Sequence, residues 1–141
     1  LRLAVIGDPI SHSRSPAIHT AALAALGIEG TYVARRVPSS EMEAVIEDLR
    51  AGRLDGVNVT MPLKGVAAAM VDETTDKARR SGSVNTIVRL PDGRLEGHST
   101  DITALERLWP SDSEPVLILG AGGAAAVQRR GCSAPQPARE L

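Results

Sequence analysis

Gly56-Val57-Asn58-Val59-Thr60-Met61-Pro62-Leu63-Lys64 is the stretch that decides how this chain folds. Its first half is apolar and largely β-branched, which is typical of a buried strand. Pro62 ends that strand, because proline has no N–H to donate to a sheet, and it suits the first turn of a following helix. Thr60 and Lys64 therefore lie at the carboxyl end of a strand, where open α/β sheets bind their ligands. A hydroxyl and an amine at that edge favour a site for a small polar molecule, although a turn with a solvated lysine fits the same residues.

Composition limits the classes of protein to which the chain can belong. Its 141 residues suit one domain, or one domain and part of another. The net charge of -1 gives no reason to expect binding to nucleic acid or to a membrane surface. The single cysteine, Cys132, excludes an intrachain disulfide and a cysteine-based metal site, and we expect no metal. No signal peptide opens the sequence and its apolar runs are too short to cross a bilayer, so we expect a cytoplasmic protein.

Strand and helix patterns alternate along the first hundred residues. Strands are predicted over residues 3–6, 31–37 and 54–59, and helices over residues 17–26, 42–49, 63–71 and 75–80. The Asp92-Gly93 turn joins two further strands, at residues 83–90 and 94–98, into a hairpin. A last helix runs through Leu105 and Leu108. This order predicts a three-layer α/β fold whose sheet is mostly parallel, with an antiparallel hairpin at its edge.

Local signals predict how the helices begin and which faces they bury. Ser15 is expected to cap the first helix, with Pro16 in its first turn and with Ile18, Ala22 and Leu26 on its buried face. The hydroxyl of Ser13 then stays free. Ser40-Glu41-Met42-Glu43 is a capping-box pattern for the second helix, which buries Met42, Val45, Ile46 and Leu49.

Polar side chains gather where the predicted strands end. Ser13 lies in a strand-to-helix loop like that of Thr60 and Lys64, and Asn85 lies in the first hairpin strand. Asp101 follows the second hairpin strand. It suits the cap of the next helix, but it also suits a carboxylate that meets Lys64, orients the amine and shares its proton. Both interpretations of Asp101 stay open on the residues alone.

The last thirty residues begin a second pattern. Residues 109–115 read as a polar linker, and residues 116–119 as a buried strand. Gly120-Ala121-Gly122-Gly123-Ala124-Ala125 follows, which is the dinucleotide fingerprint in its G-x-G-x-x-A form, placed correctly after a strand. From residue 129 the prolines oppose a further helix or central strand, so we expect an incomplete Rossmann-like unit. An unpaired apolar strand here predicts poor order after Leu119 unless another chain covers it, and a homodimer stays open.

Five segments, in this order, resemble the shikimate dehydrogenase family: Ser13-Arg14-Ser15-Pro16, residues 58–64, Val84-Asn85-Thr86, Thr100-Asp101 and Gly120-Ala121-Gly122-Gly123-Ala124. The resemblance covers residues 3–127. It implies a substrate-binding domain at residues 1–108, a linker at 109–115 and the start of an NADP-binding domain at 116–141. It also implies an enzyme that interconverts 3-dehydroshikimate and shikimate with NADPH, on the path to chorismate and aromatic amino acids.

The resemblance implies roles for individual residues. Ser13 and Ser15 would bind the substrate carboxylate, whereas Thr60, Asn85 and Asp101 would bind ring hydroxyls. Lys64 would contact the substrate and act as acid and base, with Asp101 as its partner. The cofactor would be bound by Gly120, Ala121, Gly122, Gly123 and Ala124, with Asp76 nearby.

Three features depart from the family pattern. Ser99 stands where Asn is usual, Ile102 stands where Gly is usual, and the sequence stops early in the cofactor domain. The resemblance therefore implies a chain that binds shikimate weakly and turns over little or none of it. Three alternatives stay open: a non-redox module that binds shikimate or quinate, a quinate dehydrogenase, and a folded remnant without activity.

Overall fold

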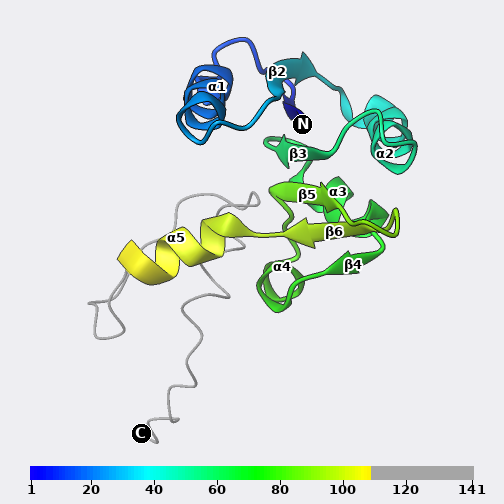
Figure 1. The fold of residues 1–141 in the computed structure, drawn as a ribbon. Helices are drawn as coiled ribbons and strands as arrows, with labels where there is room; N and C mark the ends of the chain where they lie inside the picture. Colours follow the sequence, from blue (N-terminus) through cyan, green and yellow to red (C-terminus); the bar gives the residue numbers. More distant parts are fainter. Residues whose placement is uncertain (109–141) are drawn as a thin grey trace, which may run out of the picture.

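The computed structural model describes residues 1–108 (Figure 1). They form a six-stranded mixed sheet. Its strands, from one edge to the other, are β2 (Thr31–Arg36), β1 (Arg2–Gly7), β3 (Gly56–Val59), β5 (Thr86–Arg89), β6 (Leu95–His98) and β4 (Glu73–Thr74). β1 pairs in parallel with both β2 and β3, whereas β5 runs antiparallel to β3 and β6. The predicted mixed α/β fold is confirmed. The hairpin is not the outermost element, because the short strand β4 pairs in parallel with β6 beyond it.

Helices cover both faces of the strands. They are α1 (Ser15–Ala25), α2 (Met42–Arg50), α3 (Lys64–Met70), α4 (Asp76–Ser81) and α5 (Thr100–Leu108). α1 and α2 lie on opposite sides of β1 (Figure 1). Residues alternate between the two faces along β1, so Ala4 and Ile6 face the α2 side while Val5 faces α1.

The main core lies between the sheet and helices α2, α3 and α4. Met42, Val45, Ile46 and Leu49 of α2 are all buried there, as their helical spacing predicts. Leu63, directly before α3, is fully buried in the same cluster. This burial fixes the start of α3, and therefore the position of Lys64.

The predicted buried face of α1 is wrong. Ile18 and Leu26 are 63% and 71% exposed, and Leu23 is the buried residue of this helix. The reason is that α1 packs mainly on β1 and β2, where Leu23 meets Val5 and Tyr32. A helix that covers two strands buries only the stripe that touches them.

Two predicted helix caps are also wrong. The first helix begins at Ser15 itself, and Arg14 holds the N-cap position without a side-chain hydrogen bond. Ser13 Oγ instead accepts the backbone N–H of Ser15 over 3.3 Å. At the second helix, Ser39–Glu41 forms a 3-10 turn and no side chain caps α2, because Glu41 already holds the N-cap position.

The remaining predictions about the C-terminal part lie outside the described residues. They concern the linker at 109–115, the strand at 116–119, the glycine motif at 120–125, and the expected poor order after Leu119.

Candidate functional site

The turn after β3 carries two of the predicted site residues. The Thr60 N–H donates to the carbonyl of Ile6 over 2.9 Å, and the Thr60 carbonyl accepts the N–H of Leu63 over 2.9 Å. The N–H of Asp8 also donates to the Met61 carbonyl over 3.1 Å. The loops that follow β1 and β3 are therefore tied together at the carboxyl edge of the sheet, and Lys64 begins α3 beside them.

Lys64 and Asp101 meet at this edge. Lys64 Nζ lies 2.5 Å from Asp101 Oδ2, although 37 positions separate the two residues in the sequence. Their side chains are 21% and 31% exposed, so the pair is sheltered but still open to a small molecule. Asp101 lies in the first turn of α5. Of the two interpretations of Asp101, the structure shows the contact with Lys64.

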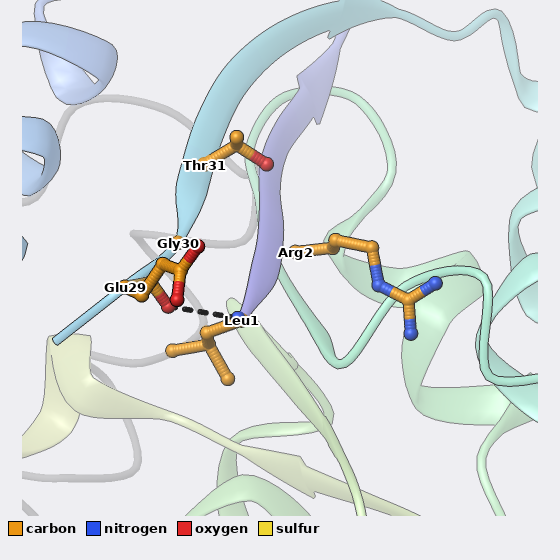
Figure 2. Close-up of a pocket in the computed structure, with 5 residues that line it drawn as sticks. All are labelled: Leu1, Arg2, Glu29, Gly30 and Thr31. Atoms are coloured by element: carbon orange, nitrogen blue, oxygen red, sulfur yellow. Dashed lines mark hydrogen bonds between the residues drawn. The ribbon is translucent and has the colours of Figure 1, made fainter.

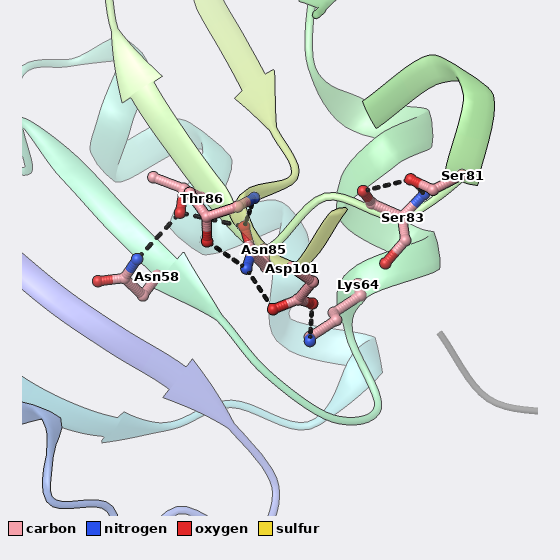
Figure 3. A network of polar contacts seen from close by, with 8 residues as sticks. Asn58, Lys64, Ser81, Ser83, Asn85, Thr86 and Asp101 are labelled. Carbon is pink, nitrogen blue, oxygen red and sulfur yellow. Dashed lines mark hydrogen bonds and ion pairs between the residues drawn. The ribbon is translucent and has the colours of Figure 1, made fainter. Parts of the chain in front are cut away.

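Asn85 holds Asp101 from the other side (Figure 3). Its Nδ2 donates to Asp101 Oδ1 over 2.8 Å and to Thr100 Oγ1 over 2.7 Å. Its Oδ1 accepts the Thr100 N–H over 3.0 Å and the Thr86 hydroxyl over 3.3 Å. An amide side chain can make four such bonds, and Asn85 makes all four within the protein. Asn85 must give one up to bind a ligand directly.

The polar cluster extends to residues that the sequence analysis did not single out. Asn58 Nδ2 donates to Thr86 Oγ1 over 3.0 Å, and Asn58 Oδ1 accepts the Tyr32 hydroxyl over 2.6 Å. Asn58 and Thr86 are register partners on β3 and β5, so they share one face of the sheet. In the sequence, Asn58 is a polar residue inside an otherwise apolar strand, and this was the available signal. Only the pairing of β3 with β5 shows that Asn58 lies opposite Thr86.

Tyr32 of β2 ends this cluster, because its hydroxyl donates only to Asn58. Burial raises the pKa of the Tyr32 hydroxyl. Among residues 1–108, Ser13 makes no direct hydrogen bond or ion pair with Lys64 or Asp101. Thr60 contributes its backbone to the turn, and its methyl group packs against Gly7.

The two departures from the family pattern beside Asp101 are both buried. Ile102 is 1% exposed, so its side chain anchors the first turn of α5 in the protein interior. Ser99 is 4% exposed, and its hydroxyl has no hydrogen-bond partner among the described residues. The segment that presents Asp101 is therefore packed on both sides.

Asp76 lies apart from these contacts. It stands in the first turn of α4, its side chain is 89% exposed, and it forms an ion pair with Arg79 of the same helix. Its expected place near a cofactor stays a prediction. Gly120, Ala121, Gly122, Gly123 and Ala124 lie outside the described residues.

A shallow pocket lies at the amino ends of β1 and β2, formed by Leu1, Arg2, Glu29, Gly30 and Thr31 (Figure 2). This is the edge of the parallel strands opposite to Lys64, so the pocket is separate from the polar cluster. We assign the candidate site to the polar cluster, because its side chains contact one another at the carboxyl edge of the sheet, where open α/β sheets bind their ligands.

Residues 1–108 contain no group of three or more His, Cys, Asp or Glu side chains arranged to hold a metal ion. None of the helices in this range has the length and apolar character that a membrane span requires.

Comparison with known proteins gives a consistent result. The family model "Shikimate dehydrogenase substrate binding domain" matches residues 5–87. The chain is 48% identical to shikimate dehydrogenase (NADP(+)) of Rhodospirillum rubrum, over 86% of this chain and 45% of that protein. It is 40% identical to the same enzyme of Lysinibacillus sphaericus, over 92% of this chain and 51% of that protein.

Solved structures agree with the sequence comparisons. The crystal structure of shikimate 5-dehydrogenase from Thermus thermophilus in complex with NADP(H) and shikimate is similar, with a TM-score of 0.81 and 40% identity. The match covers 94% of this chain and 51% of that one. The chain thus spans about half the length of the relatives it matches. Since the family model matches more than half of its residues, the chain belongs to the family of shikimate dehydrogenase substrate binding domains.

Proposed function

We propose that this chain carries the substrate-binding part of an NADP-dependent shikimate dehydrogenase, which interconverts 3-dehydroshikimate and shikimate. The observation that carries the proposal is the 2.5 Å contact between Lys64 and Asp101 at the carboxyl edge of the sheet, held by Asn85. The Thermus thermophilus relative, of similar fold, is known in complex with NADP(H) and shikimate.

Lys64 is proposed to handle the proton of the reacting hydroxyl. An ammonium group has three N–H donors, and the contact with Asp101 uses one of them. In the direction of reduction, Lys64 donates a proton to the substrate oxygen that becomes a hydroxyl. In the direction of oxidation the amine takes that proton back. Asp101 keeps the Lys64 nitrogen in place in both directions and accepts a hydrogen bond from it.

The serine loop is proposed to bind the substrate carboxylate. Ser13 Oγ accepts the Ser15 N–H, and this leaves the Ser13 hydroxyl proton available to donate. Ser15 supplies the second hydroxyl. Thr60, Asn85 and Asp101 are proposed to bind the ring hydroxyls, and Asn85 then exchanges one of its internal hydrogen bonds for a substrate contact.

Residues 1–108 do not by themselves show a fit to NADP. The one predicted cofactor residue among them, Asp76, is exposed and paired with Arg79, and the glycine motif lies outside the described range. When bound, NADP supplies the hydride chemistry of this enzyme class. The described residues contribute substrate binding, orientation and control of the proton.

Titration of the chain with shikimate, followed by NMR, tests the proposal. We expect Lys64→Gln to weaken binding about ten- to hundredfold, because it removes a charge-assisted hydrogen bond. Where NADP-dependent turnover can be measured, it should fall further than affinity does, by about a hundredfold or more, as for loss of a general acid.

Lys77→Gln is the matched control for this titration. Lys77 is also ion-paired, with Glu106, and hydrogen-bonded, to Thr103, but neither contact involves Asp101 or the turn after β3. It should leave shikimate binding unchanged. Equal binding by the wild-type chain and the Lys64→Gln variant would remove Lys64 from the site.

A non-redox shikimate- or quinate-binding module is the second candidate. The observation in its favour is that Lys64, Asn85 and Asp101 are held together by contacts within residues 1–108 alone. Separate titrations with shikimate and NADP distinguish the two: binding of both supports the dehydrogenase, and binding of shikimate alone supports the module. Titration with quinate, compared with that of shikimate, shows which of the two compounds the chain binds more tightly. The homodimer and the cytoplasmic location stay predictions.

A further inference from the structure

β2 is an open edge of the sheet. It is the outermost strand, and among residues 1–108 it pairs only with β1. The N–H groups of Thr31 and Val37, at the two ends of β2, donate to carbonyls on the β1 side. Backbone direction alternates along a strand, so the N–H and C=O groups of Tyr32, Ala34 and Arg36 point away from the sheet. Within the described part of the chain, these backbone groups have no strand to pair with.

A second copy of the chain can pair with this edge. Antiparallel pairing about a two-fold axis at Val33 places Tyr32 of one copy opposite Ala34 of the other. The outward N–H and C=O groups of these two residues then bond across the axis. Val33 is 51% exposed, and in this register it packs against Val33 of the second copy. The edge is therefore complementary to itself.

The charges along β2 favour the antiparallel direction. Glu29 precedes the strand, whereas Arg35 and Arg36 end it. Antiparallel pairing brings the acidic end of one copy to the basic end of the other, and parallel pairing would place the arginines side by side. Arg35 and Arg36 are also ion-paired within the chain, with Asp48 at 2.5 Å and with Asp8 at 2.8 Å. They therefore protect the edge less than unpaired charges would.

The exposed side of α1 extends this surface. α1 lies beside β2 at the same end of the sheet (Figure 1). Ile18, Ala22 and Leu26 repeat every four residues along α1, and all three are exposed. Ile28, which is 45% exposed, follows in the segment that leads into β2. A two-fold axis perpendicular to the sheet places the α1 helices of both copies on one face of the joined sheet, where these apolar side chains cover one another.

The rest of this chain leaves from another part of the sheet. The described residues end at Leu108 of α5, and α5 follows β6. β1, β3 and β5 all lie between β6 and β2. A second copy is thus better placed than residues 109–141 to cover β2, because it brings a matching edge, matching charges and a matching apolar stripe together.

We propose that β2 and α1 form the interface of a homodimer, in which β2 of one copy pairs antiparallel with β2 of the other. This inference goes beyond the proposed function and does not depend on it. No ligand takes part in its test.

Sedimentation velocity of the whole chain, over a wide range of concentration, tests the interface. We expect a reversible equilibrium between monomer and dimer. Val33→Lys places two ammonium groups against each other at the two-fold axis, so it should raise the Kd of the dimer about tenfold or more. Val88→Lys is the matched control. Val88 is also an exposed valine, but it lies on β5 in the middle of the sheet, and its variant should leave the Kd unchanged.

Amide hydrogen exchange of the wild-type chain is a second measurement, which needs no variant. The N–H groups of Tyr32, Ala34 and Arg36 should exchange more slowly as the concentration rises, because the dimer alone protects them. The N–H of Val59 donates to the Asn85 carbonyl over 2.8 Å within the chain, so its exchange should not depend on this interface.

Each outcome decides for or against the interface. A dimer that Val33→Lys weakens and Val88→Lys does not supports it. A chain that is monomeric at every concentration overturns it, and slow exchange of the β2 edge in that monomer would show that residues 109–141 cover the edge. A dimer that both variants leave intact would also overturn it, because the copies then meet elsewhere. If Val33→Lys does not fold, the dependence of β2 exchange on concentration decides.

Discussion

Gly7, the last residue of β1, lies against Thr60, the residue that follows β3. A Cβ atom on Gly7 would overlap with Thr60 Cγ2 and would lie 3.0 Å from the Met61 carbonyl oxygen. The Gly7 carbonyl also accepts the N–H of Val37 over 3.1 Å, which keeps this backbone in place. The turn that carries Lys64 can approach β1 this closely only because residue 7 has no side chain.

Gly7→Ala should therefore push the 60–62 turn away from β1. We expect a loss of about 1–3 kcal/mol in the free energy of unfolding, as for overpacking elsewhere, together with weaker binding of shikimate. Urea unfolding and shikimate titration measure the two effects.

Gly65→Ala is the control for this substitution. Gly65 is the second residue of α3, and nothing lies within 4 Å of the position that its Cβ would take. Alanine favours the helix there, so the variant should be more stable by about 0.5–1 kcal/mol. A Gly7→Ala variant with unchanged stability and binding would show that the close approach is not needed.

Leu63 and Met61 flank Pro62 in the same turn but differ in burial. Leu63 is fully buried in the main core, whereas Met61 is 69% exposed. Leu63→Ala should lower the free energy of unfolding by about 2–5 kcal/mol, because it leaves a cavity under the start of α3. Met61→Ala should change it by less than about 0.5 kcal/mol. Similar losses in urea unfolding of the two variants would contradict the burial of Leu63.

Periodicity and punctuation in the sequence predicted the order of strands and helices, and the structure confirms that order. Gly52 and Gly82, which follow the helices predicted at residues 42–49 and 75–80, and Gly93 of the predicted hairpin turn all have positive φ. The patterns failed where contacts with other elements decide the outcome. The buried stripe of α1 depends on how few strands the helix covers, and β4 has only two residues, too few to show a period.

Part of the candidate site could also be predicted from the sequence. Parallel strands end at one edge, so the sequence could bring Thr60, Lys64 and Asp101 to that edge. It could not show that Asn58 and Thr86 are register partners, or that Tyr32 reaches across β1 to Asn58. Those contacts depend on strand order, which places β1 between two strands that are distant in sequence.

Two buried serines near the site should respond differently to loss of their hydroxyls. Ser81 Oγ donates to the Ala78 carbonyl over 3.0 Å and accepts the Ser83 N–H over 3.2 Å. Ser99 Oγ is buried without a partner in residues 1–108. Ser81→Ala should lower the free energy of unfolding by about 1–3 kcal/mol, because it leaves buried polar groups unpaired. Ser99→Ala should be neutral or slightly stabilising. A larger loss for Ser99→Ala in urea unfolding would mean that its hydroxyl is bonded.

Asp72 should make the stability of the fold depend on acid pH. Its carboxylate accepts the backbone N–H of Leu95 over 2.8 Å and pairs with Arg50 at 2.7 Å, and so links β6 to α2. These contacts, the Leu95 hydrogen bond first, hold the pKa of Asp72 below its ordinary value of 3.8. A carboxyl group whose pKa is lower in the folded chain than in the unfolded chain stabilises the fold at every pH above its pKa in the unfolded chain. This stabilisation is lost as the pH falls through its pKa in the folded chain.

Asp72→Asn should therefore be less stable than the wild-type chain at pH 7, and the difference should shrink as pH falls below 3.8. Urea unfolding at a series of pH values measures it. Asp48 and Asp55, whose pKa values are also lowered by arginine and backbone contacts, remain in both proteins. Both proteins therefore lose the same stability from these two residues as the pH falls. Glu43→Gln, which changes an exposed carboxyl on α2, is the control at pH 7 and should be as stable there as the wild-type chain, within about 0.5 kcal/mol. A difference between wild-type and Asp72→Asn chains that is the same at every pH would show that charge on Asp72 does not stabilise the link between β6 and α2.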